Sequence, residues 1–285
     1  MMECDGIKHN IMTYSMLING YLKIKDWANA FAIFEDLVKD GLKPDVVLYN
    51  NMIRAFCGMG NMDRAIHTVK EMHKERHLPT THTFMPIIHG FARAGEMRRA
   101  LEVFDMMRRS GCIPTVHTFN ALILGLTEKL QMKKAVEILD EMTLAGISPN
   151  EHTYTTIMHG WARRGDVWEA ADLMQQMKQE GVQSDIHTYT SFINACCKAG
   201  DMLRAMNTIH EMDAIGVKPN VKTYTTLIHG WARASLPEKA LKCFEEMKLT
   251  GLKPDKAVYH CLMTSLLSRA TVAEAYVYSG VLSVC

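Results

Sequence analysis

The hydrophobic residues of this chain are spaced three and four positions apart, which is the pattern of a helix with one buried face. Within residues 151–185, a first apolar stripe consists of Tyr154, Ile157, Met158 and Trp161. After a break at Gly165 and Asp166, a second stripe consists of Ala170, Leu173, Met174 and Met177. Gly181 then stands where a left-handed residue would end the second helix. The pattern predicts two helices, over His152–Arg163 and Val167–Lys178.

This hairpin pattern recurs every 35 residues. An aromatic residue takes the same place in each repeat, at Tyr14, Tyr49, Phe84, Phe119, Tyr154, Tyr189, Tyr224 and Tyr259. An alanine recurs in the second helix, at Ala30, Ala65, Ala100, Ala135, Ala170, Ala205, Ala240 and Ala275. Such repeats are too small to bury their own apolar faces, so consecutive repeats stack on one another. The sequence therefore predicts an all-α solenoid of helix hairpins.

Proline separates most repeats, because it cannot continue a helix interior. It lies at Pro44, Pro79, Pro114, Pro149, Pro219 and Pro254. We expect seven complete repeats, at 11–45, 46–80, 81–115, 116–150, 151–185, 186–220 and 221–255. Residues 1–10 are interpreted as the tail of a preceding repeat, and 256–285 as a partial eighth repeat. The chain is expected to be a piece of a longer protein, with any targeting leader upstream.

The end of the chain, Val272–Cys285, is apolar and stops before another Gly-x-x-Pro closing. A half-finished repeat exposes its stacking face, so we expect self-association through it or a missing capping repeat.

The composition narrows the function classes. The 285 residues are 48% hydrophobic, and no apolar run approaches about 18 residues, so no membrane span is expected. The eight cysteines include no C-x-x-C spacing and are expected to be reduced and mostly buried. A methionine that recurs in the second helix is assigned to core packing, at Met72, Met107, Met142, Met177, Met212 and Met247.

No catalytic motif is present. The histidine pairs His82/His89, His152/His159 and His73/His77 lack the further partners that a metal site needs. The sequence contains neither a phosphate-binding G-x-x-x-x-G-K-[ST] loop nor a zinc-deaminase signature. We therefore expect no enzyme, cofactor or metal in this part of the chain.

Charge is divided between the two helices of each repeat. The net charge is only +1, but the first helical segments (11–24 and every 35 residues onward) carry 11 basic and two acidic residues. These segments have a formal charge of +9, which leaves −8 for the remainder, and they hold eight of the 13 histidines. Basic residues near helix C-termini are favoured by the helix dipole, which explains part of this bias but not the scarcity of acids. A face made of first helices would attract a polyanion.

The 35-residue period, the Thr-Tyr-Thr or Thr-Tyr-Asn opening, the recurrent alanine and the Gly-x-x-Pro-Asp/Asn closing resemble the pentatricopeptide repeat (PPR) family. The resemblance covers essentially the whole chain, and the uniform repeat length is similar to the P-type subclass. It implies a right-handed superhelix. The nearest alternative, the tetratricopeptide repeat, has a 34-residue period and binds peptides. A scaffold that binds peptides or partner proteins therefore stays as a second hypothesis.

The resemblance implies sequence-specific binding of single-stranded RNA, one base per repeat, through the fifth and last residue of each repeat. The implied pairs are Ser15/Asp45, Asn50/Thr80, Met85/Thr115, Asn120/Asn150, Thr155/Asp185, Thr190/Asn220 and Thr225/Asp255.

The chemistry of these pairs suggests which bases they select. An Asp carboxylate only accepts hydrogen bonds, so it suits the ring N–H of G or U, whereas an Asn amide can donate to A or C. Short Thr or Ser at the fifth position leaves room for a purine, and longer Asn reaches a pyrimidine. Met85/Thr115 has no polar fifth side chain and selects nothing. The predicted RNA is 5′-G-Y-N-Y-G-A-G-3′.

Two further sets of residues complete the predicted interface, the first from the resemblance and the second from the position of the basic residues in the first helices. The second residue of each repeat would sandwich a base, at Met12, Val47, His82, His117, His152, His187 and Lys222. This position is usually a small aliphatic, and imidazole can instead stack on a base. Phosphate contacts are predicted at Lys23, Arg93, Arg163, Lys198 and Arg233. The family implies an organellar role, in a plastid rather than a mitochondrion, in RNA splicing, stabilisation, processing or translation, with other RNA-processing proteins as partners.

Overall fold

The computed structural model describes residues 10–267, which form 15 α-helices joined by short turns. The first helices of the hairpins are α1 (Ile11–Lys23), α3 (Val46–Gly58), α5 (Thr81–Ala94), α7 (Val116–Glu128), α9 (Glu151–Arg164), α11 (Ile186–Ala199), α13 (Val221–Arg233) and α15 (Lys256–Leu267). The second helices are α2 (Trp27–Lys39), α4 (Met62–Lys74), α6 (Met97–Arg109), α8 (Met132–Leu144), α10 (Val167–Gln179), α12 (Met202–Ala214) and α14 (Pro237–Leu249). Each odd-numbered helix begins 35 residues after the previous one. The apolar C-terminal end, on which self-association was predicted, lies outside the described residues.

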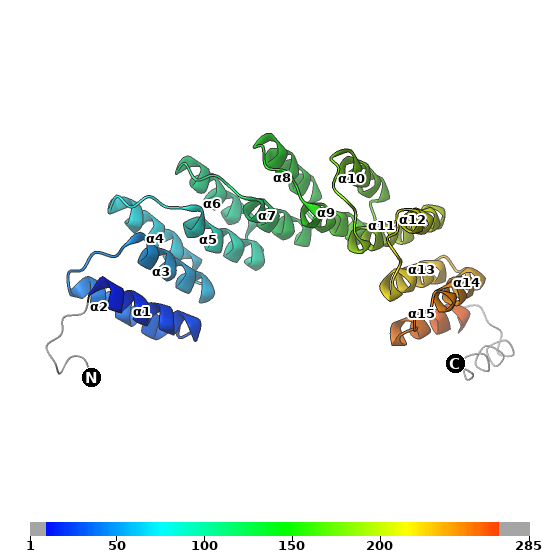
Figure 1. Cartoon of the computed structure of the whole chain (residues 1–285), viewed down its shortest axis with the longest axis horizontal. Coiled ribbons are helices and arrows are strands. Elements are labelled where there is room, and N and C mark those ends of the chain that lie inside the picture. The colour runs from blue at the N-terminus through cyan, green and yellow to red at the C-terminus, as the bar shows by residue number, and fades with distance from the viewer. Residues whose placement is uncertain (1–9, 268–285) are drawn as a thin grey trace. The chain divides into compact units, whose positions relative to one another are not determined.

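The helices form two compact units, Met1–Ser148 and Pro149–Cys285. In the first, α1, α3, α5 and α7 pack on one another in sequence, and each also packs on the second helix of its own hairpin. In the second, α9, α11, α13 and α15 stack in the same way. Within each unit the odd-numbered helices make one layer and the even-numbered helices the other (Figure 1). The prediction of an all-α solenoid of helix hairpins is confirmed. Among the described helices, none has the length and apolarity required to span a bilayer.

The recurrent apolar residues form the core. The recurrent aromatic of the first helix is almost inaccessible to solvent from Tyr14 to Tyr224, with Phe84 and Tyr154 at 0% exposure, and is half-buried at Tyr259. Every recurrent alanine from Ala30 to Ala240 is also at 0%, where a larger side chain would force neighbouring helices apart. The recurrent methionines are fully buried, so their assignment to core packing is confirmed. Phe104 and Phe119 meet edge to face, with ring centroids 5.4 Å apart, and join α6 to α7.

Left-handed residues end most helices. Glycine takes this conformation at ten positions of the described chain, Gly165 (φ 81°) and Gly181 (φ 72°) among them. The same turns are closed by non-glycine residues at Lys25, Arg76, Leu130 and Ser235, with φ between 56° and 61°. A residue with a Cβ is strained there, so these four turns are less stable than their glycine counterparts.

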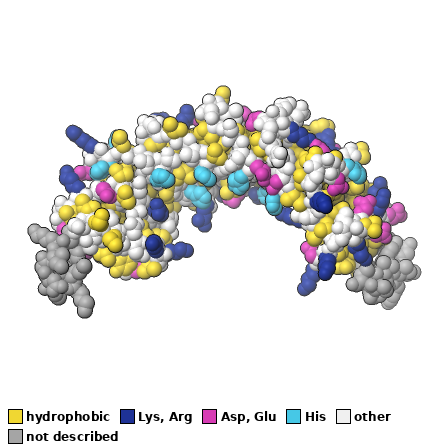
Figure 2. Space-filling view, in the orientation of Figure 1, with side chains coloured by type: hydrophobic (Ala, Val, Ile, Leu, Met, Phe, Trp, Pro, Cys, Tyr) yellow, Lys and Arg dark blue, Asp and Glu magenta, His cyan; other side chains and the backbone are white. Residues whose placement is uncertain are grey.

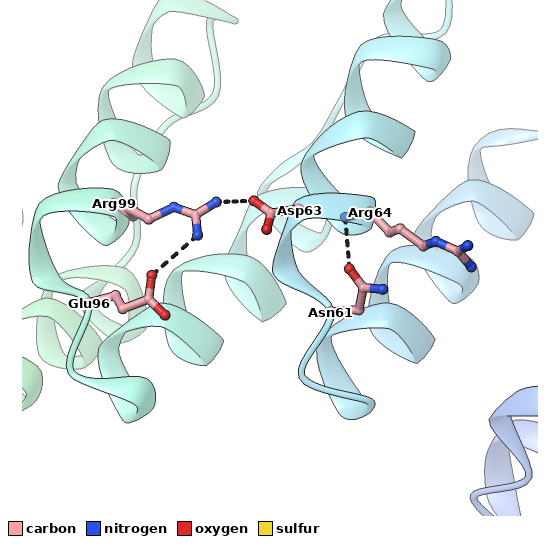
Figure 3. Close-up of polar contacts among 5 residues, drawn as sticks. All are labelled: Asn61, Asp63, Arg64, Glu96 and Arg99. Carbon is pink, nitrogen blue, oxygen red and sulfur yellow. Dashed lines mark hydrogen bonds and ion pairs between the residues drawn. The ribbon is translucent and has the colours of Figure 1, made fainter.

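Ion pairs between neighbouring repeats link the even-numbered helices. Arg99 of α6 pairs with Asp63 of α4, and its Nη1 lies 3.2 Å from Glu96 Oε2 (Figure 3). In the same view Asn61 caps α4 by accepting a hydrogen bond from the backbone N–H of Arg64 at 3.2 Å. Similar pairs are Arg108–Glu141, between α6 and α8, and Lys178–Glu211, between α10 and α12. In this layer these basic side chains are thus paired with carboxylates of the neighbouring repeat.

Candidate nucleic-acid interface

The odd-numbered helices expose one stripe of side chains in each unit. All residues predicted to sandwich bases are exposed on the first turn of these helices, Met12 at 72% and Val47 at 58%. The remaining members of that set are His82, His117, His152, His187 and Lys222. Figure 2 shows histidine side chains exposed over the odd-numbered helices in both units. In four repeats this exposed first-turn position is therefore occupied by an imidazole ring.

The predicted phosphate contacts lie at the other end of the same helices. Lys23, Arg93, Arg163, Lys198 and Arg233 are exposed, each in the last turn of its helix. Lys198 Nζ also donates a hydrogen bond to the backbone carbonyl of Arg163, at 3.2 Å, so cations of consecutive repeats lie side by side in the C-terminal unit. The N-terminal unit has two exposed cations at this helical position and the C-terminal unit three, which suits a polyanion in each unit.

The last residue of each predicted repeat caps the following first helix. Asp45 Oδ1 accepts a hydrogen bond from the N–H of Leu48 at 2.8 Å, and Asp255 Oδ1 from that of Val258 at 2.9 Å. Thr80, Thr115, Asn150, Asp185 and Asn220 occupy the N-cap position in the same extended conformation. Asn, Asp, Ser and Thr are preferred at N-caps for this reason alone. Helix capping therefore explains why these residue types recur at this position. Only the side-chain atoms that are not used by the cap remain to bind RNA.

A buried threonine joins the two predicted base-selecting residues in four repeats. It is the third residue of the following first helix, at Thr83, Thr118, Thr188 and Thr223, all at 0% exposure. Its hydroxyl contacts the fifth residue of the previous repeat: Asn50 at 2.7 Å, the sulfur of Met85 at 3.1 Å, Thr155 at 2.6 Å and Thr190 at 2.9 Å. The same threonine hydrogen-bonds the N-cap residue, as Thr188 does with Asp185 Oδ1 at 2.7 Å (backbone N) and 2.8 Å (hydroxyl).

The remaining pairs differ. The position of the bridging threonine is taken by Leu48 beside Asp45 and by Val258 beside Asp255, both at 0% exposure. The half-buried Ser15 and Thr225 are the fifth residues of these two repeats. The hydroxyl of Thr225 donates to the carbonyl of Val221 in its own helix, at 2.7 Å.

The fourth pair divides between the two units. Asn120 is half-buried on α7 of the N-terminal unit, while Asn150 caps α9 of the C-terminal unit. Asn150 Oδ1 accepts hydrogen bonds from the backbone N–H and the hydroxyl of Thr153, at 3.0 and 2.9 Å.

The bridging threonines were not identified from the sequence, although one of their two contacts, the one with the N-cap residue, has a recognisable sequence pattern. Asn or Thr followed three residues later by Thr is a variant of the capping box. This pattern predicts the contact between Thr223 and Asn220. The contact with Thr190 spans 33 residues of sequence and depends on how the repeats stack.

Three titratable groups on this face of the C-terminal unit have perturbed pKa values. Burial and the nearby cations Arg163, Lys222 and Lys198 lower the pKa of His159. Burial and a hydrogen bond with Asp185 raise the pKa of Glu151. Burial opposes ionisation of Asp185, but hydrogen bonds from Thr188 outweigh it and lower its pKa. Around His159 the local potential is therefore positive, and Asp185 is ionised at neutral pH.

Buried thiols do not contribute to this face. Burial raises the pKa of Cys57, Cys196 and Cys197 to about 12, so they are protonated and unreactive at neutral pH. Within residues 10–267, no three His, Cys, Asp or Glu side chains gather as a metal site would require.

A sequence model of the PPR repeat family matches residues 9–47, 44–93, 79–128, 114–163, 153–198, 185–233 and 223–268. A chloroplastic pentatricopeptide repeat-containing protein of Arabidopsis thaliana is 74% identical over 27 residues, which are 10% of this chain and 3% of that protein.

Among solved structures, the pentatricopeptide repeat protein PPR10 from maize is similar over 99% of this chain, with a TM-score of 0.67 and 23% identity. PPR10 in complex with an 18-nt psaJ RNA element is similar over 98% of the chain, with a TM-score of 0.58 and 22% identity. The chain spans 45–46% of the PPR10 structures, and their likeness concerns the fold.

Proposed function

The chain belongs to the PPR repeat family, and from this premise we propose that it binds single-stranded RNA base-specifically, one base per 35-residue repeat. The repeats are those that end at the N-cap residues, namely 11–45, 46–80, 81–115, 116–150, 151–185, 186–220 and 221–255. The observation that carries the proposal is the paired geometry on the odd-numbered helices. There the fifth and last side chains are held together by a buried threonine in several repeats, and exposed cations lie at the other end of helices of the same layer.

The three sets of residues on this face would have different roles in RNA binding. The exposed cations would contact phosphates and supply affinity without regard to sequence. The exposed second residues, of which four are histidines, would stack on the bases. The fifth and last residues would select them through hydrogen bonds to their Watson–Crick edges. The solved complex of PPR10 with an RNA element supports RNA as the ligand class, because the two proteins share their fold.

The RNA sequence that this arrangement selects is 5′-G-Y-N-Y-G-A-G-3′, read from the first repeat to the seventh. The pairs Thr155/Asp185 and Thr225/Asp255 select G, and Thr190/Asn220 selects A. The uniform repeat length supports the P-type subclass. The Arabidopsis relative, though matched over 27 residues only, supports a plastid as the compartment. Holding a segment single-stranded would protect it from nucleases or guide the folding of an intron, with no chemistry performed by the repeats.

Fluorescence anisotropy with a labelled RNA containing 5′-GCUCGAG-3′ tests the proposal. A scrambled RNA and a DNA copy serve as controls at about 0.15 M salt. We expect the designed RNA to bind at least about tenfold more tightly than the scrambled RNA, since each mismatch typically costs about 1–3 kcal/mol. Equal binding of all three would reduce the face to a nonspecific basic track. Failure to bind any of them would leave the peptide-binding scaffold as the better hypothesis.

A further inference from the structure

The bridging hydroxyls have a defined direction, and this direction determines what the base-selecting residues offer to a base. In the sixth repeat, Asn220 Oδ1 accepts from the backbone N–H of Thr223 at 3.0 Å and from its hydroxyl at 3.1 Å. A backbone N–H can only donate, so the amide oxygen must face the helix. The Asn220 nitrogen is thereby turned away from the cap, where it can donate to a ligand.

The hydroxyl of Thr190 is oriented by the same contact. Thr223 has one hydroxyl proton, and Asn220 receives it. The hydroxyl oxygens of Thr190 and Thr223 lie 2.9 Å apart, so Thr190 must supply the proton of that hydrogen bond. The Thr190 oxygen then has lone pairs only for a base. Together the pair offers one donor and one acceptor, which matches the N1 acceptor and the N6 amino group of adenine.

In the fifth repeat the hydroxyl protons point the same way, but the pair offers a different set of hydrogen-bonding groups to a base. Thr188 donates its proton to Asp185 Oδ1 at 2.8 Å, so Thr155, at 2.6 Å from Thr188, donates in turn. Thr155 and the Asp185 carboxylate then offer acceptors only. Guanine, which carries N1–H and N2–H₂ on one edge, fits two acceptors.

We propose that Thr188 and Thr223 are specificity-positioning residues, which fix the donor and acceptor pattern that the neighbouring fifth and last side chains present to a base. The inference rests on the proposed function. A free threonine hydroxyl at the fifth position could rotate to donate or accept, and would then tolerate more than one base. A fully buried bridging hydroxyl removes that freedom in the free protein, so the rotational entropy of the fifth-position hydroxyl is lost on folding rather than on RNA binding.

The chain contains its own comparison. Val258 occupies the bridging position beside Thr225 and Asp255 and is at 0% exposure. Valine has nearly the shape of threonine but no hydroxyl, and here Thr225 gives its proton to the carbonyl of Val221 instead. The acceptor of Thr225 is a carbonyl that its own helix already pairs, so this hydroxyl can leave it and rotate to donate to a base at little cost. We expect the seventh repeat to discriminate less sharply than the fifth, although both carry a Thr/Asp pair.

The test measures discrimination within each variant. Affinities for 5′-GCUCGAG-3′ and 5′-GCUCGGG-3′, which differ at the sixth base, are compared for wild type, Thr223→Val and Thr223→Ser. We expect Thr223→Val to lower the A-over-G ratio about fivefold, the equivalent of ~1 kcal/mol for one hydrogen bond. Thr223→Ser, which keeps the hydroxyl, should retain the wild-type ratio. Discrimination at the fifth base should be unchanged in both variants, which separates local positioning from general loss of structure.

The reverse substitution is the matched gain-of-function control. Val258→Thr keeps the volume of the side chain and supplies the missing hydroxyl, so it should raise the G-over-A ratio at the seventh base about fivefold. Unchanged ratios in Thr223→Val, in a wild type that does discriminate, would overturn the positioning role and leave RNA binding intact. A wild type that binds no RNA would overturn the proposed function first, and this inference with it.

Discussion

Replacing Asn220 by aspartate exchanges the outward amide nitrogen for an oxygen while the cap of α13 is kept. The cap uses one side-chain oxygen, which accepts from Thr223 at 3.0 and 3.1 Å, and aspartate supplies the same atom. Aspartate caps helices as well as asparagine does, and its charge favours a helix N-terminus. The variant should therefore unfold at the wild-type temperature or slightly above it.

Base preference should reverse. With adenine, the variant loses one donated hydrogen bond, about 1 kcal/mol, and sets an oxygen lone pair against the lone pair of N1. With guanine, the carboxylate accepts from N1–H, a charge-assisted bond of about 1.5–3 kcal/mol. We expect a combined change of about 2–3 kcal/mol, so the A-over-G ratio at the sixth base should fall by about 30- to 150-fold. Asn220 is only half-buried, so water partly screens the new charge, and the change should lie near the lower end of this range.

The assay is anisotropy with the two RNAs that differ at the sixth base, with thermal unfolding followed by circular dichroism. A matched control exchanges the two bases at the fifth position, where Asp185 is untouched. If folded Asn220→Asp still preferred adenine, either the repeat boundaries or the base assignment of the last residue would be wrong.

Three further predictions concern charge and backbone strain. His159→Gln should flatten the pH dependence of RNA affinity. Burial and nearby cations keep the pKa of this histidine below its usual range, so it is neutral in the free protein, whereas a bound phosphate favours its protonation. Wild-type affinity should therefore rise by up to about tenfold per pH unit as pH falls through the pKa of His159 in the complex. Arg233→Gln should lower the affinity for all RNAs alike. The slope of log K against log[salt], about −3.5 for five phosphate contacts, should become about 0.7 less steep, which salt titrations of two RNA sequences would reveal. Arg76→Gly should stabilise the fold by about 0.5–1 kcal/mol, because φ is 61° there, whereas Gly41→Ala (φ 71°) should destabilise it in the same denaturation series.

Much of the fold follows from the repeat period, because it is a local pattern copied along the chain. The predicted helix Val167–Lys178 is observed as Val167–Gln179, and His152–Arg163 as Glu151–Arg164. The left-handed turns at Lys25 and Leu130 carry no glycine signal. Only the spacing of the other repeats indicates a turn at these positions.

The candidate site was less predictable, because it forms between repeats. The exposed cations could be placed from helical periodicity, as could the second residues on the first turn. The role of the last residue as an N-cap is a local signal, and it explains the restricted residue types without any ligand. The bridging hydroxyls of Thr188 and Thr223 depend on contacts across 33 residues, so sequence spacing alone could not pair them with Thr155 and Thr190.

The central claim is that consecutive repeats select consecutive bases in a fixed order. The most direct test selects bound sequences from an RNA library with seven random positions between constant flanks and sequences them. We predict enrichment of G, a pyrimidine, any base, a pyrimidine, G, A and G, in that order from the 5′ end. Enrichment without positional order, or of an unrelated sequence, would contradict the claim.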